Sequence, residues 1–90
     1  MAKKSLRQQI IEFCERNKFE YQELPNKDKH YDYRNCIEIY PKDPYMISIY
    51  VSWNYKYEAH LRDGYSTIAE ILNFDIFDLI DFMGEYDLLP

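Results

Sequence analysis

The sequence predicts a single small α+β domain over residues 1–90, in the order α-β-β-β-β-α-α, with an antiparallel meander and helices packed on one face. Three observations predict this class. Hydrophobic residues make up 47% of the 90 residues, which is enough to form a core and excludes disorder. Hydrophobic and polar residues alternate through the middle of the chain, as in a half-buried strand. Both ends carry hydrophobic residues at helical spacing, and such helices pack most simply on one face of a meander.

The first predicted element is a helix over residues 5–17. Ser5 and Gln8 fit a capping box, in which the hydroxyl and the amide each satisfy a free backbone N–H. Asn17 is a suitable residue to end the helix. The hydrophobic side of this helix is formed by Leu6, Ile10, Phe13 and Cys14. A short strand over residues 19–24 is expected to follow, because Pro25 stops the extended run.

The meander is predicted from hydrophobic residues that all occupy odd positions: Ile37, Ile39, Ile47, Ile49, Val51, Trp53, Tyr55, Tyr57, Ala59 and Leu61. A period of two places all of them on one face of a sheet. The segment Pro-Lys-Asp-Pro at 41–44 breaks the run into a hairpin. If Ile39 faces Ile47, then Ile37 faces Ile49 and the loop covers residues 41–45.

The placement of odd-numbered residues on the core face also selects the length of the second loop of the meander. A two-residue loop would place a lysine on the core face. A three-residue loop over 54–56 keeps the odd positions on that face and pairs Val51 with Ala59 and Trp53 with Tyr57. A single long bent strand is the alternative, and we favour the meander because a strand of that length is rare.

Two helices are expected after Asp63-Gly64 ends the sheet. Ser66 is the expected cap of the first, which contains Ile68, Ala69, Ile71 and Leu72 and ends at Asn73-Phe74. Asp75 caps the second, and Gly84 is expected to end it. The second helix has one hydrophobic side, formed by Ile76, Leu79, Ile80 and Met83, with Phe77 and Phe82 at its borders.

The charge distribution is uneven. Residues 1–34 carry eight basic and six acidic side chains, whereas residues 35–90 carry three basic and ten acidic ones. No Lys or Arg follows Arg62. At about 100° per residue, Asp78, Asp81 and Glu85 lie within about 60° of one another on the last helix. Such a row can imitate a phosphate track and bind a basic surface, while a solvated face of an amphipathic helix is the simpler interpretation.

Tyrosine is the second compositional signal, with ten in the chain. Its stiff aromatic face and polar tip are enriched where proteins contact partners. Tyr45, Tyr50 and Tyr65 are expected in loops or on the outer face of the sheet, and strand propensity is the alternative reason for their presence. The predicted partner-binding residues are Asp75, Asp78, Asp81, Glu85, Glu70, Tyr45, Tyr50 and Tyr65.

Other function classes are disfavoured. The sequence has no nucleotide-binding or nucleophile motif and no metal-ligand spacing, so we expect no enzyme, no metal and no cofactor. In the expected register Cys36, Tyr50 and His60 form one row on the outer face, with Cys36 and His60 about 9–10 Å apart, too far for a catalytic pair. The negative charge and the acids on the last helix argue against direct nucleic-acid binding. No secretory signal or membrane span is expected, which favours the cytoplasm.

In size, acidity and aromatic content the chain resembles small inhibitor proteins of phages and mobile elements and bacterial immunity proteins, a resemblance of composition. The resulting hypothesis is a non-enzymatic acidic inhibitor that binds a basic protein, at the nucleic-acid-binding surface of a nuclease or host-defence complex. The alternative is a small homodimeric structural or regulatory protein without a nucleic-acid-mimic role, associating through a patch formed by Phe77, Phe82, Leu88 and Leu89.

Overall fold

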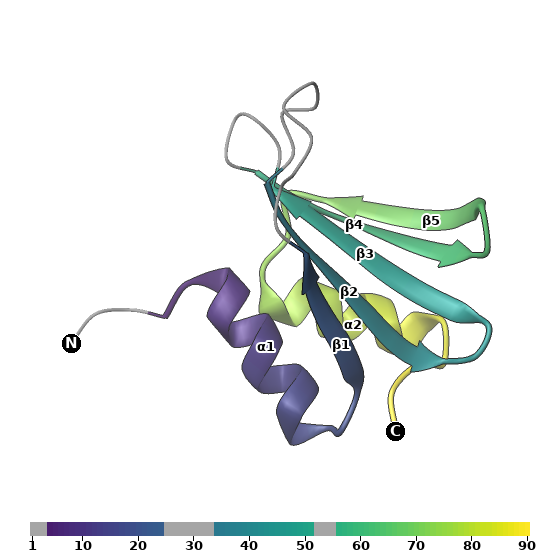
Figure 1. The fold of residues 1–90 in the computed structure, drawn as a ribbon, viewed down its shortest axis with the longest axis horizontal. Helices are drawn as coiled ribbons and strands as arrows, with labels where there is room; N and C mark the ends of the chain where they lie inside the picture. Colours follow the sequence, from purple (N-terminus) through teal and green to yellow (C-terminus); the bar gives the residue numbers. More distant parts are fainter. Residues whose placement is uncertain (1–3, 25–33, 52–55) are drawn as a thin grey trace.

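A computed structural model describes residues 4–24, 34–51 and 56–90 of the chain. It confirms an α+β fold, in which five antiparallel strands follow one helix and precede another along the chain (Figure 1). The elements in chain order are α1 (Leu6–Arg16), β1 (Glu20–Leu24), β2 (Arg34–Lys42), β3 (Tyr45–Val51), β4 (Tyr57–Asp63), β5 (Ser66–Leu72) and α2 (Ile76–Glu85). The observed order is therefore α-β-β-β-β-β-α instead of the expected α-β-β-β-β-α-α.

Helix α1 begins and ends where its sequence predicts. The Ser5 hydroxyl accepts a hydrogen bond from the backbone N–H of Gln8 over 3.1 Å, and Ser5 itself has extended backbone angles. At the other end, the Asn17 side chain donates to the carbonyl oxygen of Phe13 over 2.9 Å. Each cap satisfies a backbone group that a helix terminus leaves free. Ile10, Phe13 and Cys14 are buried, as the helical spacing predicts.

The sheet is a meander with strand order β1-β2-β3-β4-β5, and every pairing is antiparallel. The predicted pairs Ile37 with Ile49 and Ile39 with Ile47 are confirmed. The expected loop over 41–45 is wrong, because Lys42 pairs with Tyr45 and leaves only Asp43-Pro44 between the strands. The pairing of β2 with β3 continues past Ile39 to Lys42, with a register shift between these two residues.

The predicted register of β3 with β4 is shifted by two residues. Val51 pairs with Tyr57 and Ile49 with Ala59, whereas the sequence predicted Val51 opposite Ala59. The expected pair of Trp53 with Tyr57 lies partly outside the described residues. A shift of two leaves every side chain on its predicted face, so hydrophobic alternation does not distinguish the two registers.

The predicted helix at residues 66–72 is wrong, because this segment is strand β5. Gly64 has a φ of 63° and begins the two-residue turn that leads from β4 into β5. A glycine at the first central position suits a tight hairpin turn, which returns the chain beside the strand that it has just left. Ala69 then lies opposite Leu61 and Ile71 opposite Ala59 on the core face.

Helix α2 begins at the predicted cap. The Asp75 side chain accepts from the backbone N–H of Asp78 over 2.9 Å, and the Asp78 side chain accepts from the backbone N–H of Asp75 over 3.0 Å. This is a reciprocal capping box. The expected end at Gly84 is wrong by a residue, since the helix continues through it to Glu85.

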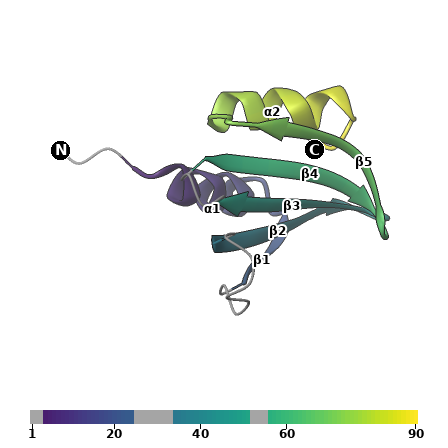
Figure 2. The ribbon, with the colours of Figure 1, turned by 90° about the horizontal axis from the view of Figure 1, so that it is seen from above.

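Both helices pack on one face of the sheet, as predicted (Figures 1 and 2). Figure 2 shows α2 beside β5, the last strand of the sheet. The fully buried centre combines residues from all three parts: Ile10 and Cys14 of α1, Ile37, Ile39, Ile47, Ile49 and Ala59 of the sheet, and Leu79 and Met83 of α2. Phe82, expected at a border, is only 5% exposed and belongs to this core, whereas Phe77 is 71% exposed.

Candidate functional site

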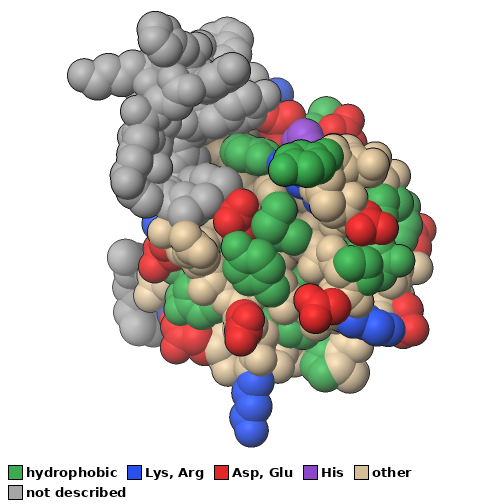
Figure 3. All heavy atoms as spheres, turned by 45° about the vertical axis from the view of Figure 1, so that its right-hand side comes forward, with side chains coloured by type: hydrophobic (Ala, Val, Ile, Leu, Met, Phe, Trp, Pro, Cys, Tyr) green, Lys and Arg blue, Asp and Glu red, His purple; other side chains and the backbone are tan. Residues whose placement is uncertain are grey.

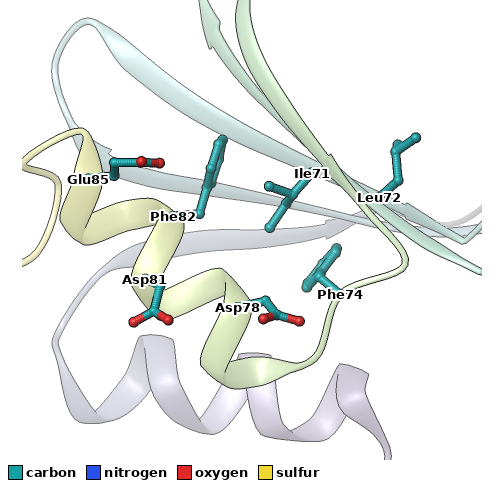
Figure 4. Close-up of a pocket in the computed structure, with 7 residues that line it drawn as sticks. All are labelled: Ile71, Leu72, Phe74, Asp78, Asp81, Phe82 and Glu85. Carbon is teal, nitrogen blue, oxygen red and sulfur yellow. The ribbon is translucent and has the colours of Figure 1, made fainter.

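An open groove of about 490 Å³ lies between β5 and α2 (Figure 4). Seven residues line it: Ile71, Leu72, Phe74, Asp78, Asp81, Phe82 and Glu85. Figure 4 shows Ile71 directed from the strand toward the helix and Phe82 directed from the helix toward the strand. The groove therefore combines hydrophobic side chains with three carboxylates from a single helix.

The hydrophobic part of the groove is anchored in the core. Phe74 is 7% exposed, and its ring meets that of Tyr57 edge to face at a centroid distance of 6.1 Å. Phe82 makes a similar contact with Tyr86 at 5.3 Å. Rings packed in this way have few alternative rotamers, so the groove is preformed and loses little conformational freedom when a partner binds.

The acids of α2 divide into two groups. Asp75 and Asp78 belong to the capping box, and both lie near the helix N-terminus, where the helix dipole favours negative charge. Their presence is explained by the stability of α2. Asp78 also lines the groove, so it contributes to the potential there.

Asp81 and Glu85 have no such role. Both are exposed, and no side-chain hydrogen bond or ion pair joins either of them to another described residue. Glu85 is the last residue of α2, where the helix dipole disfavours a carboxylate, and the last turn of α2 contains no basic residue. No Lys or Arg follows Arg62 in the sequence, and none of the ion pairs found among the described residues involves an acid of α2.

The remaining predicted binding residues lie in other places. Glu70 is on the opposite face of β5, where its Oε2 lies 3.7 Å from Nδ1 of His60. Tyr45 packs against the core cluster, although the sequence placed it among the exposed tyrosines. Tyr65 lies at the β4–β5 turn and is fully exposed, and Tyr50 is half-buried on the outer face of the sheet. The structure thus groups only Asp78, Asp81 and Glu85 around one groove, with Asp75 next to it.

Figure 3 shows the side of the molecule that carries the β2–β3 and β4–β5 turns. Acidic and hydrophobic side chains lie next to one another across this face, and basic side chains are few. The mixture matches what composition predicts for the second half of the chain.

The predicted row of Cys36, Tyr50 and His60 is also corrected. His60 lies opposite Ser48, and Tyr50 lies opposite Glu58. The rings of Tyr50 and His60 still meet edge to face at 5.4 Å, as diagonal neighbours on adjacent strands. The side chain of Cys36 lies outside the described part of the structure.

Sequence reasoning missed a polar cluster on the outer face of the sheet. The Ser48 hydroxyl, Nε2 of His60 and Nε of Arg62 are buried without a hydrogen-bond partner among the described residues. Their even positions were a usable signal, because alternation assigns even residues to the face opposite the core. Ser48 has no exposed surface, so its hydroxyl is not accessible to a substrate.

The one described cysteine side chain is structural. Cys14 is fully buried, and desolvation, with a smaller contribution from the neighbouring Glu15 carboxylate, raises the pKa of its thiol to about 12. A thiol that stays protonated near neutral pH is a poor nucleophile. The described residues also contain no cluster of His, Cys, Asp or Glu suited to hold a metal ion.

Comparison with protein-family models, with curated proteins and with solved structures found no match to this chain. Among the described helices, neither is long and hydrophobic enough to cross a bilayer.

Proposed function

We propose that this protein is a non-enzymatic inhibitor that binds a basic, nucleic-acid-binding surface of another protein. The observation that supports this proposal is the pair Asp81 and Glu85, which line a hydrophobic groove without a charged partner in the described structure. A nuclease or a host-defence complex in the cytoplasm is the proposed target. The proposed biological class is an anti-defence protein of a phage or mobile element.

The spacing of the acids suits this role. Residues four apart on a helix are separated by about 6 Å along its axis. Two steps along one strand of a duplex separate phosphates by about 6.8 Å along the axis. Asp81 and Glu85 therefore present charges at nearly the interval that a phosphate-binding channel accommodates.

The hydrophobic side chains of the groove strengthen the ion pairs that these acids can form. A partner that covers Phe82 and Ile71 excludes water from the groove, and ion pairs strengthen as the local dielectric constant falls. The charges then mainly set the association rate and the class of partner, while the buried hydrophobic contacts set the residence time. Affinity is expected to fall with added salt.

The hydrophobic patch predicted for the homodimer alternative is largely buried. Of the residues expected to form its hydrophobic patch, Phe82 is 5% exposed and Leu88 is 3% exposed, so both belong to the core. Leu89 is partly buried against the same cluster, which leaves Phe77 as the exposed member.

The proposal is tested with the full chain and one pair of variants. Asp81→Asn combined with Glu85→Gln removes two charges from the groove without touching the capping box. Glu20→Gln combined with Asp43→Asn removes two exposed charges elsewhere and serves as the matched control. Each protein is used to capture partners from a bacterial lysate at low and high salt, followed by mass spectrometry.

The expected result is a nucleic-acid-binding protein that is retained at low salt by the parent and the control but lost from the groove variant. Added DNA or RNA should then compete for the same captured protein. Capture that is equal for both variants, or a partner that binds nucleic acid and this protein simultaneously, would contradict the proposal.

A further inference from the structure

Strand β5 is an open edge of the sheet. It is the last strand in the order β1-β2-β3-β4-β5, and in the described part of the chain its backbone is hydrogen-bonded to β4 and to no other element. Its outer edge therefore presents backbone N–H and C=O groups that are free to pair with another strand. Ile68 is 45% exposed and Leu72 is 58% exposed, so the strand is also hydrophobic at its surface.

The opposite edge of the sheet is protected. Strand β1 carries exposed Glu20 and Glu23, and the Arg7 side chain of α1 forms an ion pair with Glu23. Charged side chains and a covering helix are common protections of edge strands. Glu70 is the only charged residue of β5, and it points to the outer face, toward His60. Of the two edges, β5 is the one suited to accept a further strand.

We propose that the β5 edge binds an extended segment of the partner as a sixth strand, with Lys or Arg at alternate positions facing α2. This inference rests on the proposed function and specifies its binding mode. Helix α2 lies next to β5 in Figure 2, and the residues that line the groove come from both elements. Side chains two apart on a strand are about 6.8 Å apart, which matches the interval of about 6 Å between Asp81 and Glu85.

Charge complementarity selects a basic segment over a second copy of this chain. Antiparallel pairing of two β5 strands about a twofold axis places both α2 helices on the same face, on either side of the seam. The acids of one α2 would then approach those of the other, and each chain already carries a net charge of −5. Like charges across a seam oppose association, whereas a lysine-bearing strand relieves the repulsion along α2.

The probe is a synthetic seven-residue peptide in which lysine and valine alternate, blocked at both ends. A peptide of the same composition, with its lysines and valines in two blocks, is the control for charge alone. Two further versions carry N-methyl groups on either the valine or the lysine amides. Since the N–H groups of alternate residues point to the same edge of a strand, each version blocks one edge.

Binding is measured by fluorescence polarisation, and amide hydrogen exchange is followed in residues 66–72. Strand addition predicts that the alternating peptide binds better than the blocked one and slows exchange in β5. It also predicts that one N-methylated version binds at least about tenfold more weakly than the other. Equal affinity of the two N-methylated versions, with no protection of β5, would overturn strand addition.

The Asp81→Asn/Glu85→Gln variant separates this inference from the proposed function. Loss of two exposed ion pairs predicts peptide binding about tenfold weaker than that of the Glu20→Gln/Asp43→Asn control. If the groove variant loses the cellular partner but the peptide shows no edge preference, only strand addition fails. If the groove variant binds both as tightly as the control, the proposed function fails as well. Concentration-dependent dimerisation that protects β5 without peptide would assign the edge to a second copy and refute a basic partner strand.

Discussion

Opposite effects on stability are expected from acids at the two ends of α2. Asp75→Ala removes the cap side chain and with it the hydrogen bond from the backbone N–H of Asp78, whereas the backbone N–H of residue 75 can still donate to the Asp78 carboxylate. Glu85→Gln removes a carboxylate from the last residue of the same helix, where it faces the negative end of the dipole. The first change should destabilise the fold, and the second should leave its stability unchanged or increase it.

The magnitudes follow from these contacts. Loss of an N-cap side chain costs about 0.5–2 kcal/mol, typically about 1 kcal/mol. Relief of the unfavourable charge at the C-terminus contributes about 0.3–1 kcal/mol. For a domain of this size 1 kcal/mol corresponds to about 4–8 °C in Tm. For the typical loss of about 1 kcal/mol, Asp75→Ala should therefore lower Tm by about 4–8 °C, and Glu85→Gln should raise it by up to about 8 °C.

Thermal and urea unfolding followed by circular dichroism measure both effects, with Asp81→Asn expected to stay within about 0.5 kcal/mol of the parent. The difference in stability between Asp75→Ala and Glu85→Gln tells whether Glu85, like Asp75, stabilises the fold. If Glu85→Gln lowers stability as much as Asp75→Ala does, Glu85 has a structural role in the fold. Glu85 would then no longer be evidence for a partner that binds the groove.

Three other expectations concern the core. Burial raises the pKa of the Cys14 thiol from 9.0 to about 12, so the folded state holds this proton more tightly than the unfolded state does. The stability advantage of the parent over Cys14→Ala should therefore shrink as the pH rises through that range. In a Cys36→Ser background, Ellman's reagent should react with Cys14 only as fast as the chain unfolds. Ser48→Ala should raise the free energy of unfolding in urea by about 1 kcal/mol, because it removes a buried hydroxyl without a partner among the described residues. A clear loss of stability would instead reveal a hydrogen bond to this hydroxyl. Leu79→Ala should cost about 2–5 kcal/mol and Phe77→Ala less than about 0.5 kcal/mol, and similar losses would contradict the orientation of α2.

The sequence itself determined the elements that carry local or periodic signals. The Ser5 and Asp75 caps are set by side chains that bond to backbone groups three residues away, so a short window of sequence contains the whole interaction. The alternating isoleucines of β2 and β3 determine the buried face, and the Pro-Lys-Asp-Pro segment between them indicates where the chain turns, which together predict the pairing of Ile39 with Ile47. These contacts lie close together along the chain.

The identity of β5 was decided by tertiary structure. Its seven residues, Ser-Thr-Ile-Ala-Glu-Ile-Leu, fit a helical spacing about as well as an alternating one. As a strand the segment gains the free edge of β4 as a hydrogen-bonding partner, and the glycine turn at Gly64 returns it to that edge. A helix of that length would have had little stability of its own.

The candidate site likewise has one part that the sequence predicts and another that depends on tertiary structure. The acidic stripe on α2 was predictable, since the helical periodicity places Asp78, Asp81 and Glu85 on one side. Its hydrophobic neighbours Ile71 and Leu72 were not, because they join the groove only when β5 pairs with β4 and α2 packs beside it. Periodicity reports which residues share a face of one element, whereas a groove depends on how two elements pack, and that is determined by the core as a whole.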